Sequence, residues 1–241
     1  MQLIDTYPCS LYGDAGSFID KNTLSYLNSG CNGHVWQLEN EKGKFAVKTF
    51  INREFCLDYT LYEKMANLEL QQILKAIEAF KHLDSAFDMD AYMMHYLEKD
   101  SEFSMLDYPV SLLLDNFSTL SKDAKMLADN HIVMCDVGVV NSIFDVLTSK
   151  LYVSDIDYFY YDESVSSFRI LDRHYELLLD LFVSYMRKGL EESDFLSFDK
   201  NNYITQLNQL FMDDYRFNKP CDKIEQVFGK YETPRQYFVK K

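Results

Sequence analysis

The chain has 241 residues, of which 47% are hydrophobic and 26% are charged, which is the composition of a globular protein and excludes a disordered chain. Eight glycines and four prolines are too few for a collagen-like or linker-rich architecture. The sequence carries 24 Lys and Arg against 38 Asp and Glu, a formal net charge of −14. Because such a surface repels phosphate backbones and anionic lipid, we expect neither nucleic acid nor a membrane surface as the main partner. An anionic nucleotide would need a locally built positive site.

No apolar run is long enough to cross a bilayer, so we expect no membrane insertion. The first residues, MQLIDTYPCSLYGD, lack the basic and apolar regions of a Sec signal. The five cysteines are far apart and form no C-x-x-C pair, which argues against a disulfide framework and a zinc site. These features predict a cytoplasmic protein, or one delivered into a host cell without a Sec signal.

The first third of the chain has the patterns of β-strands. Residues 35–38 and 44–50 are short apolar or alternating runs, and residues 39–43 between them have the composition of a hairpin turn. Residues 53–68 have helical spacing of apolar side chains. Two further strands are predicted at 72–79 and 91–97.

From residue 111 onward the pattern is mostly helical. We expect helices at 112–120, 124–130, 172–188 and 203–212, with short apolar runs at 141–144 and 151–154 between them. The sequence therefore predicts a single α+β domain with a small β-rich N-lobe, residues 1–96, and a mainly helical C-lobe, residues 97–241. A cleft between two lobes is a common place for a ligand.

Two features of the predicted N-lobe could bind phosphate. Gly30 and Gly33 are three residues apart before a strand, where backbone N–H groups can approach a phosphate without an intervening Cβ. Lys48 follows one hairpin later in an apolar strand, which places its ammonium below the glycine loop. The alternatives are an ordinary loop entering a strand and a solvated edge lysine.

Four acidic or amide residues of the predicted C-lobe could form a metal and phosphate site. Asp136 and Asn141 are five positions apart on a turn that leads into an apolar strand. The aspartate can orient a hydroxyl, and the amide oxygen is a hard ligand for Mg²⁺. Asp155 and Asp157 follow the next strand and are either solvated loop charges or metal ligands.

Taken in order, these features resemble the protein-kinase-like fold: a glycine loop, a strand lysine, a helix with a glutamate, Asp-x4-Asn and a later aspartate. The family's Val-Ala-Ile-Lys corresponds to the sequence Phe-Ala-Val-Lys ending at Lys48, and its D-F-G to Asp155-Ile156-Asp157. Its H-R-D loop corresponds to Met-Cys-Asp ending at Asp136. The stretch YMMHYL looks like the family's hinge, with Met94 as gatekeeper, and Asp172 looks like the aspartate that begins the central C-lobe helix.

The resemblance implies roles in binding ATP. Gly30 and Gly33 would cover the ATP phosphates, and Lys48 would contact the α- and β-phosphates. The lysine would pair with a helix glutamate, which we assign to Glu63, with Glu54 as the alternative. The predicted ATP site is completed by Val35, Ala46, Met94, His95 and Leu97.

The resemblance also implies a catalytic group and a metal site. Asp136 would accept or orient the substrate hydroxyl. Asn141 and Asp155 would hold Mg²⁺, with Asp157 as the alternative ligand if the register shifts. Catalysis would consist of positioning and charge neutralisation.

The sequence departs from the family pattern at several positions. Asn28 stands at the first glycine, and Met134 and Cys135 stand before the catalytic aspartate. The segment from Asp155 to Asp172 is short and contains no Ala-Pro-Glu. With these departures the sequence resembles a small bacterial Ser/Thr kinase with a reduced C-lobe, of the kind that acts as an effector on a protein substrate. The alternatives are a kinase of small molecules such as aminoglycosides or choline, and a pseudokinase that only binds.

Overall fold

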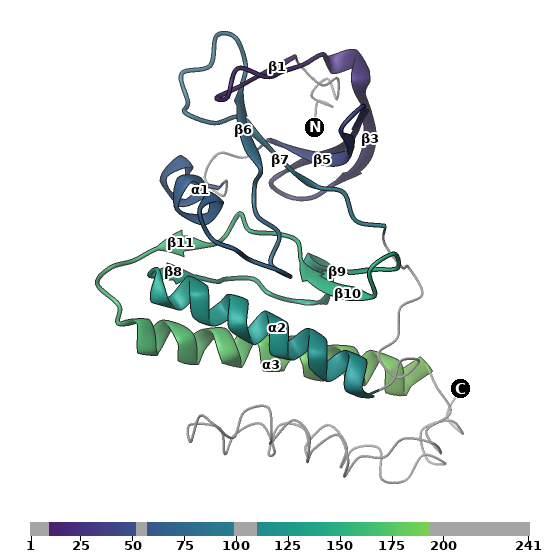
Figure 1. Cartoon of the computed structure of the whole chain (residues 1–241), viewed down its shortest axis with the longest axis vertical. Coiled ribbons are helices and arrows are strands. Elements are labelled where there is room, and N and C mark those ends of the chain that lie inside the picture. The colour runs from purple at the N-terminus through teal and green to yellow at the C-terminus, as the bar shows by residue number, and fades with distance from the viewer. Residues whose placement is uncertain (1–9, 52–56, 99–109, 193–241) are drawn as a thin grey trace.

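A computed structural model describes residues 10–51, 57–98 and 110–192 of the chain. The described residues form a sheet-rich lobe and a second lobe built on two long helices (Figure 1). The expected α+β class with a β-rich N-lobe is confirmed. Within these three ranges, no helix combines the length and the apolar character needed to cross a membrane.

The N-lobe is one curled sheet of seven strands in the order β2-β1-β6-β7-β5-β4-β3, in which each neighbouring pair is antiparallel (Figure 1). The sequence did not predict β1 and β2, because strands this short show no period of alternating side chains. The strands are β1 Leu11–Gly13, β2 Phe18–Ile19, β3 Leu24–Ser29, β4 Gly33–Asn40, β5 Gly43–Phe50, β6 Glu78–Lys81 and β7 Ala91–His95.

The hairpin of β4 and β5 contains the two longest strands of this sheet and confirms the prediction made from alternation. Trp36, Leu38 and Val47 are buried in an apolar cluster on one face of the sheet. Gly43 closes the turn with a φ of 128°, a conformation that residues with a Cβ rarely adopt. Both long strands therefore follow from a local pattern and a local turn.

The helix α1, Tyr59–Ala66, is shorter than the predicted helix 53–68, of which residues 53–56 lie outside the described residues. Its start is set by Asp58, whose side chain accepts a hydrogen bond from the backbone N–H of Thr60. Three side chains of α1 are buried and define its inner face: Leu61, Tyr62 and Met65.

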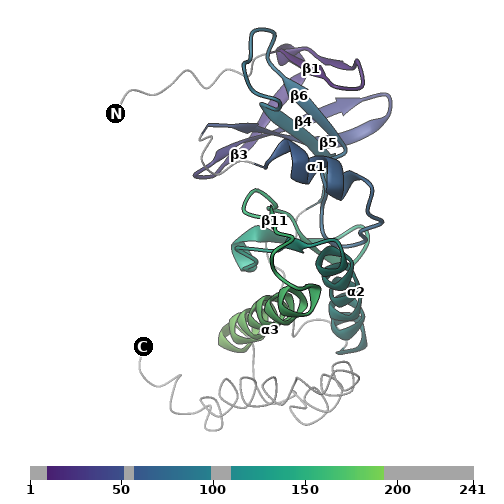
Figure 2. The same cartoon turned by 90° about the vertical axis from the view of Figure 1, so that its left-hand side faces the viewer.

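The C-lobe is built on two long helices that pack side by side, α2 Val110–Asp129 and α3 Ser167–Glu192 (Figures 1 and 2). The rings of Phe117 and Phe182 meet edge to face between them, with centroids 4.8 Å apart. The expected helices 112–120 and 124–130 are one helix, because the polar residues between them are compatible with helical backbone: the Ser121 hydroxyl donates to the carbonyl of Phe117. The predicted helix 203–212 lies outside the described residues.

Two small antiparallel pairs lie between these helices and the N-lobe (Figure 1). β8, Ile132–Val133, pairs with β11, Tyr160–Tyr161. β9, Ser142–Asp145, pairs with β10, Lys150–Val153, and confirms the expected apolar runs 141–144 and 151–154 to within a residue or two.

The segment of residues 71–74, which precedes β6, holds the two lobes together through contacts with the C-lobe. The sequence predicted a strand over 72–79 here. The backbone N–H groups of Gln71, Gln72 and Ile73 all donate to the carboxylate of Asp123 on α2, at 2.6 to 3.0 Å. The segment then pairs with the end of β10, where the N–H of Leu74 donates to the carbonyl of Val153 at 2.9 Å. Because these donors are used by the C-lobe, the regular strand begins only at Glu78.

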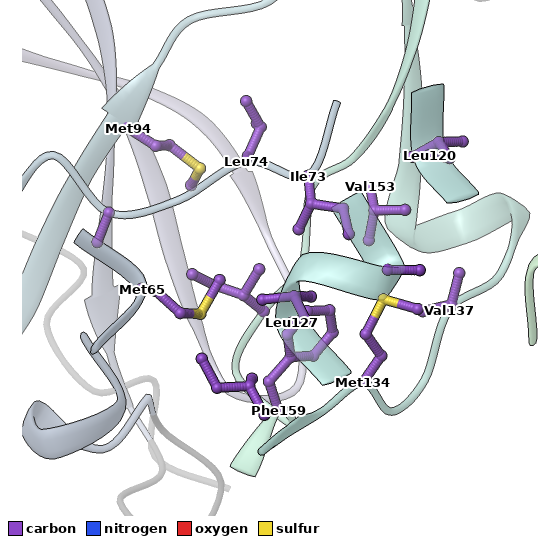
Figure 3. Close-up of a cluster of buried hydrophobic side chains, with 14 of the residues drawn as sticks. Met65, Ile73, Leu74, Met94, Leu120, Leu127, Met134, Val137, Val153 and Phe159 are labelled. Atoms are coloured by element: carbon purple, nitrogen blue, oxygen red, sulfur yellow. The ribbon is translucent and has the colours of Figure 1, made fainter. Parts of the chain in front are cut away.

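The apolar core is continuous through the joint between the lobes (Figure 3). Met65 and Met94 come from the N-lobe, and Leu127, Met134 and Phe159 come from the C-lobe. All five are buried in the same cluster, so the lobes share one core and their relative position is set by packing.

Replacing Asp123 by Asn should destabilise the fold, because the side chain would lose its charge and one of the two oxygens that accept from the backbone N–H groups of residues 71–73. We expect the free energy of unfolding to fall by roughly 2–3 kcal/mol, measured by urea denaturation. Asp115→Asn is the matched control, because Asp115 lies on the same helix and is exposed. Equal stability of the two variants would contradict this account of the joint.

Candidate functional site

A cleft of about 410 Å³ lies between the lobes, and both lobes contribute to its walls. Two other cavities, of about 350 and 500 Å³, lie in the N-lobe and contain none of the predicted site residues. Among the residues predicted for the ATP and metal sites, the cleft is lined by Gly30, Val35, Ala46, Lys48, Met94, His95, Leu97, Asn141 and Asp155. Gly33, Glu63 and Asp136 are not among the lining residues.

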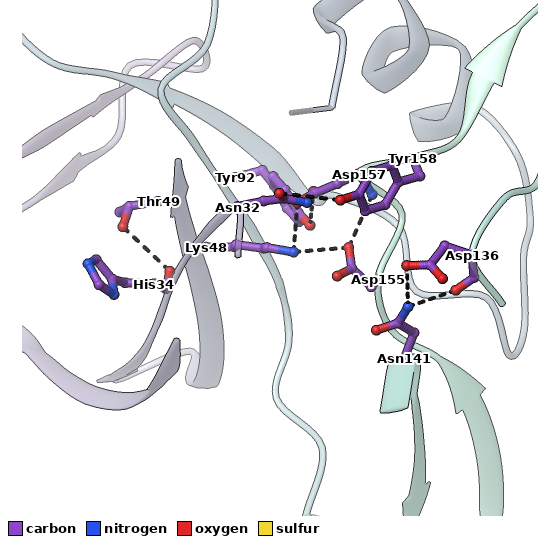
Figure 4. Close-up of polar contacts among 10 residues, drawn as sticks. All are labelled: Asn32, His34, Lys48, Thr49, Tyr92, Asp136, Asn141, Asp155, Asp157 and Tyr158. Atoms are coloured by element: carbon purple, nitrogen blue, oxygen red, sulfur yellow. Dashed lines mark hydrogen bonds and ion pairs between the residues drawn. The ribbon is translucent and has the colours of Figure 1, made fainter. Parts of the chain in front are cut away.

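Lys48 lies at the inner end of this cleft and joins the two lobes. It lies on β5, which pairs with β4 on one side and β7 on the other, so the alternative of a solvated edge lysine is excluded. Lys48 is 7% exposed, and its Nζ lies 2.9 Å from Oδ1 of Asp155 and 2.7 Å from Oδ2 of Asp157 (Figure 4). Burial alone lowers the pKa of Lys48, but the two carboxylates outweigh it and raise the pKa, so the side chain is an ammonium.

The two aspartates that hold Lys48 differ in their surroundings. The side chain of Asp155 is 25% exposed and lines the cleft, whereas that of Asp157 is fully buried. The hydroxyl of Tyr92 donates to Oδ1 of Asp157 at 2.9 Å. Burial raises the pKa of Asp157, and the Lys48 ammonium opposes that change.

The structure does not pair Lys48 with Glu63. Because α1 begins only at Tyr59 and turns Leu61, Tyr62 and Met65 inward, the side chain of Glu63 is exposed. The alternative partner, Glu54, lies outside the described residues. Within the described ranges, the ion pairs of Lys48 are those with Asp155 and Asp157.

Asp136 and Asn141 are fixed to each other, and Asn141 lines the cleft (Figure 4). The Nδ2 of Asn141 donates to the carbonyl oxygen of Asp136 at 2.7 Å and to its Oδ2 at 2.8 Å. Asp136 is exposed and has a φ of 53°, a left-handed conformation that is uncommon outside glycine. The backbone of Asn141 accepts from the N–H of Ser154, which places the loop next to Asp155.

The residues of the cleft fit a Mg²⁺ ion that is shared with a bound phosphate. Because Nδ2 of Asn141 is used by Asp136, its Oδ1 remains without a donor among the described residues. An amide oxygen and the carboxylate of Asp155 are the hard ligands that Mg²⁺ prefers, with the remaining ligands from phosphate and water. No described cluster of three or more His, Cys, Asp or Glu could hold a metal without such help.

The two predicted loop glycines differ in what surrounds them. Gly30 lines the cleft in the turn between β3 and β4, and its N–H donates to the carbonyl of Gly33 at 2.9 Å. A Cβ on Gly30 would meet no atom within 4 Å, whereas one on Gly33 would lie 2.3 Å from the carbonyl oxygen of Thr49. Gly33 is therefore required by the close approach of β4 to β5.

A buried histidine, which sequence analysis did not single out, anchors the loop that carries Asp136. The side chain of His174 on α3 is completely buried. Its Nε2 accepts from the N–H of Met134 at 2.8 Å, so its Nδ1 carries the proton and donates to the carbonyl of Ala124 at 2.9 Å. Burial lowers the pKa of His174 to about 4.

Asp172 does not have the position that the resemblance suggested. The central helix α3 begins at Ser167, so Asp172 lies one turn inside it and is exposed. His174, two positions later, points inward and binds the loop backbone. No sequence signal separates these two residues, because only the facing of α3 decides which one is buried.

The chain resembles known proteins in structure and not in sequence. No protein-family model matches it, and no curated protein matches it. Among solved structures, the kinase domain of PknI from Mycobacterium tuberculosis is similar with a TM-score of 0.47 and 15% identity, over 68% of this chain and 76% of that chain.

Replacing Gly33 by Ala should destabilise the N-lobe, because the new methyl group would displace the backbone of β5. We expect a loss of roughly 1–3 kcal/mol in the free energy of unfolding, measured by urea denaturation. Gly30→Ala is the control and should unfold at the same urea concentration as the wild type. A Gly33→Ala variant as stable as Gly30→Ala would show that the strands do not approach as described.

His174 should make the protein less stable in mild acid. Its pKa is about 4 when folded and 6.5 when exposed, so between these pH values the unfolded chain binds a proton that the folded chain excludes. The contribution is complete above pH 6.5 and is lost as the pH falls towards 4, by at most about 3 kcal/mol. The measurement is urea unfolding at pH 7.5 and 5.0.

The control for this pH effect is His174→Gln, which keeps an acceptor for the N–H of Met134 and cannot titrate. Other groups of the protein contribute equally to both proteins, so the difference between their pH dependences isolates the histidine. An equal loss of stability in both proteins between pH 7.5 and 5.0 would contradict the assignment.

Proposed function

We propose that this chain is an ATP- and Mg²⁺-dependent phosphotransferase that moves the γ-phosphate of ATP to a Ser or Thr hydroxyl of a protein. The observation that carries the proposal is the convergence of Lys48 and Asp155 at the inner end of the cleft between the lobes. These residues come from different lobes and are 107 positions apart in the chain. An ammonium beside a partly exposed carboxylate gives an acidic chain the local charges that a metal triphosphate needs.

The walls of the cleft suit an adenine nucleotide. Val35, Ala46 and Leu74 supply apolar surface, and the backbone at 95–97 supplies donors and acceptors for the edge of a base. Gly30 forms the other wall, with open space where a Cβ would lie. Lys48 lies at the far end, where it would contact the α- and β-phosphates.

The metal would be held by Asp155 and by Oδ1 of Asn141. When bound, Mg²⁺ would supply the positive charge that neutralises the phosphate oxygens during transfer. The chain itself would orient the two ligands, because Asn141 is fixed by its hydrogen bonds to Asp136.

Asp136 would position the acceptor hydroxyl. Its Oδ2 accepts from Asn141, which leaves Oδ1 for the hydroxyl of the substrate. Because His174 holds the backbone of Met134, the loop reaches this position with little freedom. Catalysis would therefore depend on positioning and on electrostatic stabilisation.

A protein acceptor is favoured by the surface next to Asp136. Val140 is 90% exposed at the mouth of the cleft, and the loop between Asp136 and Asn141 contains no charged residue. An open, apolar edge suits an extended peptide better than a polycationic small molecule.

A kinase of small molecules is the second candidate. Only residues 156–166 lie between Asp155 and α3, and β11 takes part of this segment into a pair with β8. A segment this short offers little surface for holding a protein substrate.

Labelled ATP with Mg²⁺ should transfer phosphate to the chain itself or to a generic protein such as casein. Asp155→Asn should reduce the rate by about 10²-fold or more, because one metal ligand is lost. Asp172→Asn is the matched control and should keep the wild-type rate, because Asp172 is exposed on α3.

Three other outcomes separate the alternatives. Transfer to an aminoglycoside or an alcohol, but not to protein, would favour the small-molecule kinase. Stabilisation by ATP and Mg²⁺ without any transfer would favour a pseudokinase. The absence of both binding and transfer would refute the proposed function.

A further inference from the structure

We infer that Asp157, held by Tyr92, is the residue that positions Lys48 for its contact with phosphate, in the place that the sequence suggested for Glu63. The inference rests on the proposed function and names the positioning residues of that site. It follows from contacts and burial around Lys48 (Figure 4).

Asp157 is built into the protein as a fixed carboxylate. Its side chain is fully buried, with one oxygen 2.7 Å from Nζ of Lys48 and the other accepting from the hydroxyl of Tyr92 at 2.9 Å. A buried carboxylate is stable only with such partners, because burial disfavours an unpaired charge. Both carboxylate oxygens of Asp157 thus contact side chains of the N-lobe, Lys48 and Tyr92.

Tyr92 and Lys48 reach Asp157 from adjacent strands. They are direct partners in the pairing of β5 with β7, so their side chains leave the same face of the sheet. Tyr92 is completely buried, and its ring lies 5.7 Å from that of Phe50. The hydroxyl of Tyr92 therefore has a fixed place, and it fixes the carboxylate in turn.

Asp155 and Asp157 divide two tasks between them. Asp155 is partly exposed in the cleft and is available to a metal, whereas Asp157 has no exposed surface through which a metal could reach it. If Asp155 held a metal, Lys48 would keep Asp157 as a partner and would stay directed at the phosphates.

Glu63 is not placed to replace Asp157. It is exposed on α1, and the inner face of that helix is occupied by Leu61, Tyr62 and Met65. For Glu63 to reach Lys48, α1 would have to rotate about its axis. That rotation would bury Glu63 and expose apolar side chains, which is unfavourable.

The test compares Asp157→Asn, Tyr92→Phe and Glu63→Gln in the full chain, with Asp172→Asn as the exposed control. We expect Asp157→Asn to raise the KM for ATP and to lower kcat, each by about 10-fold or more, because the lysine loses its fixed partner. Tyr92→Phe should also raise the KM for ATP and lower kcat, each by a smaller factor, since it removes one hydroxyl and no charge. Glu63→Gln and Asp172→Asn should stay within about twofold of the wild type.

A double variant distinguishes positioning from a general structural role. If Asp157 acts through Lys48, the variant Lys48→Met with Asp157→Asn should be no slower than Lys48→Met alone. Additive losses, or a loss in Glu63→Gln that exceeds the loss in Asp157→Asn, would overturn the inference and leave the proposed function intact.

If the wild type proves to be no phosphotransferase, the stabilities of the same variants test whether Asp157 or Glu63 is the partner of Lys48. In urea unfolding, Lys48→Met and Asp157→Asn should be non-additive, whereas Lys48→Met and Glu63→Gln should be additive. The reverse pattern would overturn the placement of Asp157, and absent ATP binding by the wild type would refute the proposed function separately.

Discussion

The structure of this site depends on one buried ammonium shared by two carboxylates. Lys48 brings a positive charge from the N-lobe into contact with Asp155 and Asp157 of the C-lobe, which compensate it. Removal of a charge from water is costly, so loss of Lys48 would leave the fully buried carboxylate of Asp157 without its ion-pair partner. This constraint ties the lobes together at the point where the cleft ends.

Two further buried polar side chains hold the frame around that centre. Asp123 binds three consecutive backbone N–H groups of the segment that joins the lobes, and His174 binds the backbone at the start of the loop that carries Asp136. Each lies on a long helix of the C-lobe and contacts main chain rather than other side chains. The two helices therefore act as a rigid base from which both the lobe joint and the loop are positioned.

A local positive charge in the cleft allows a protein with a large negative net charge to bind an anionic ligand. The chain has a net charge of −14, yet the inner end of the cleft contains an ammonium, and Gly30 leaves open space in the wall of the cleft. Long-range repulsion is screened over about 8 Å in physiological salt, whereas a buried lysine acts at contact distance. A local site of this kind does not need a basic surface.

The sequence by itself determined the features that depend on near neighbours. Alternation and the turn at Gly43 determined β4 and β5, and the order of Lys48, Asp136, Asn141 and Asp155 indicated the residue types of the site. These features could be predicted because strand alternation and turn conformation are properties of a few consecutive residues. The predicted helix start at 53 was less accurate, because the cap at Asp58 decides where α1 begins.

Only the tertiary structure decided which residue serves which partner. The sequence suggested Glu63 or Glu54 as the partner of Lys48 and Asp157 as an alternative metal ligand. Asp172 and His174 both fall within the predicted central helix. The choice depends on which face of α1 and of α3 is turned inward, and on the pairing of Lys48 with Tyr92 across two strands. Such contacts form between segments tens of residues apart, and packing of the whole core selects them.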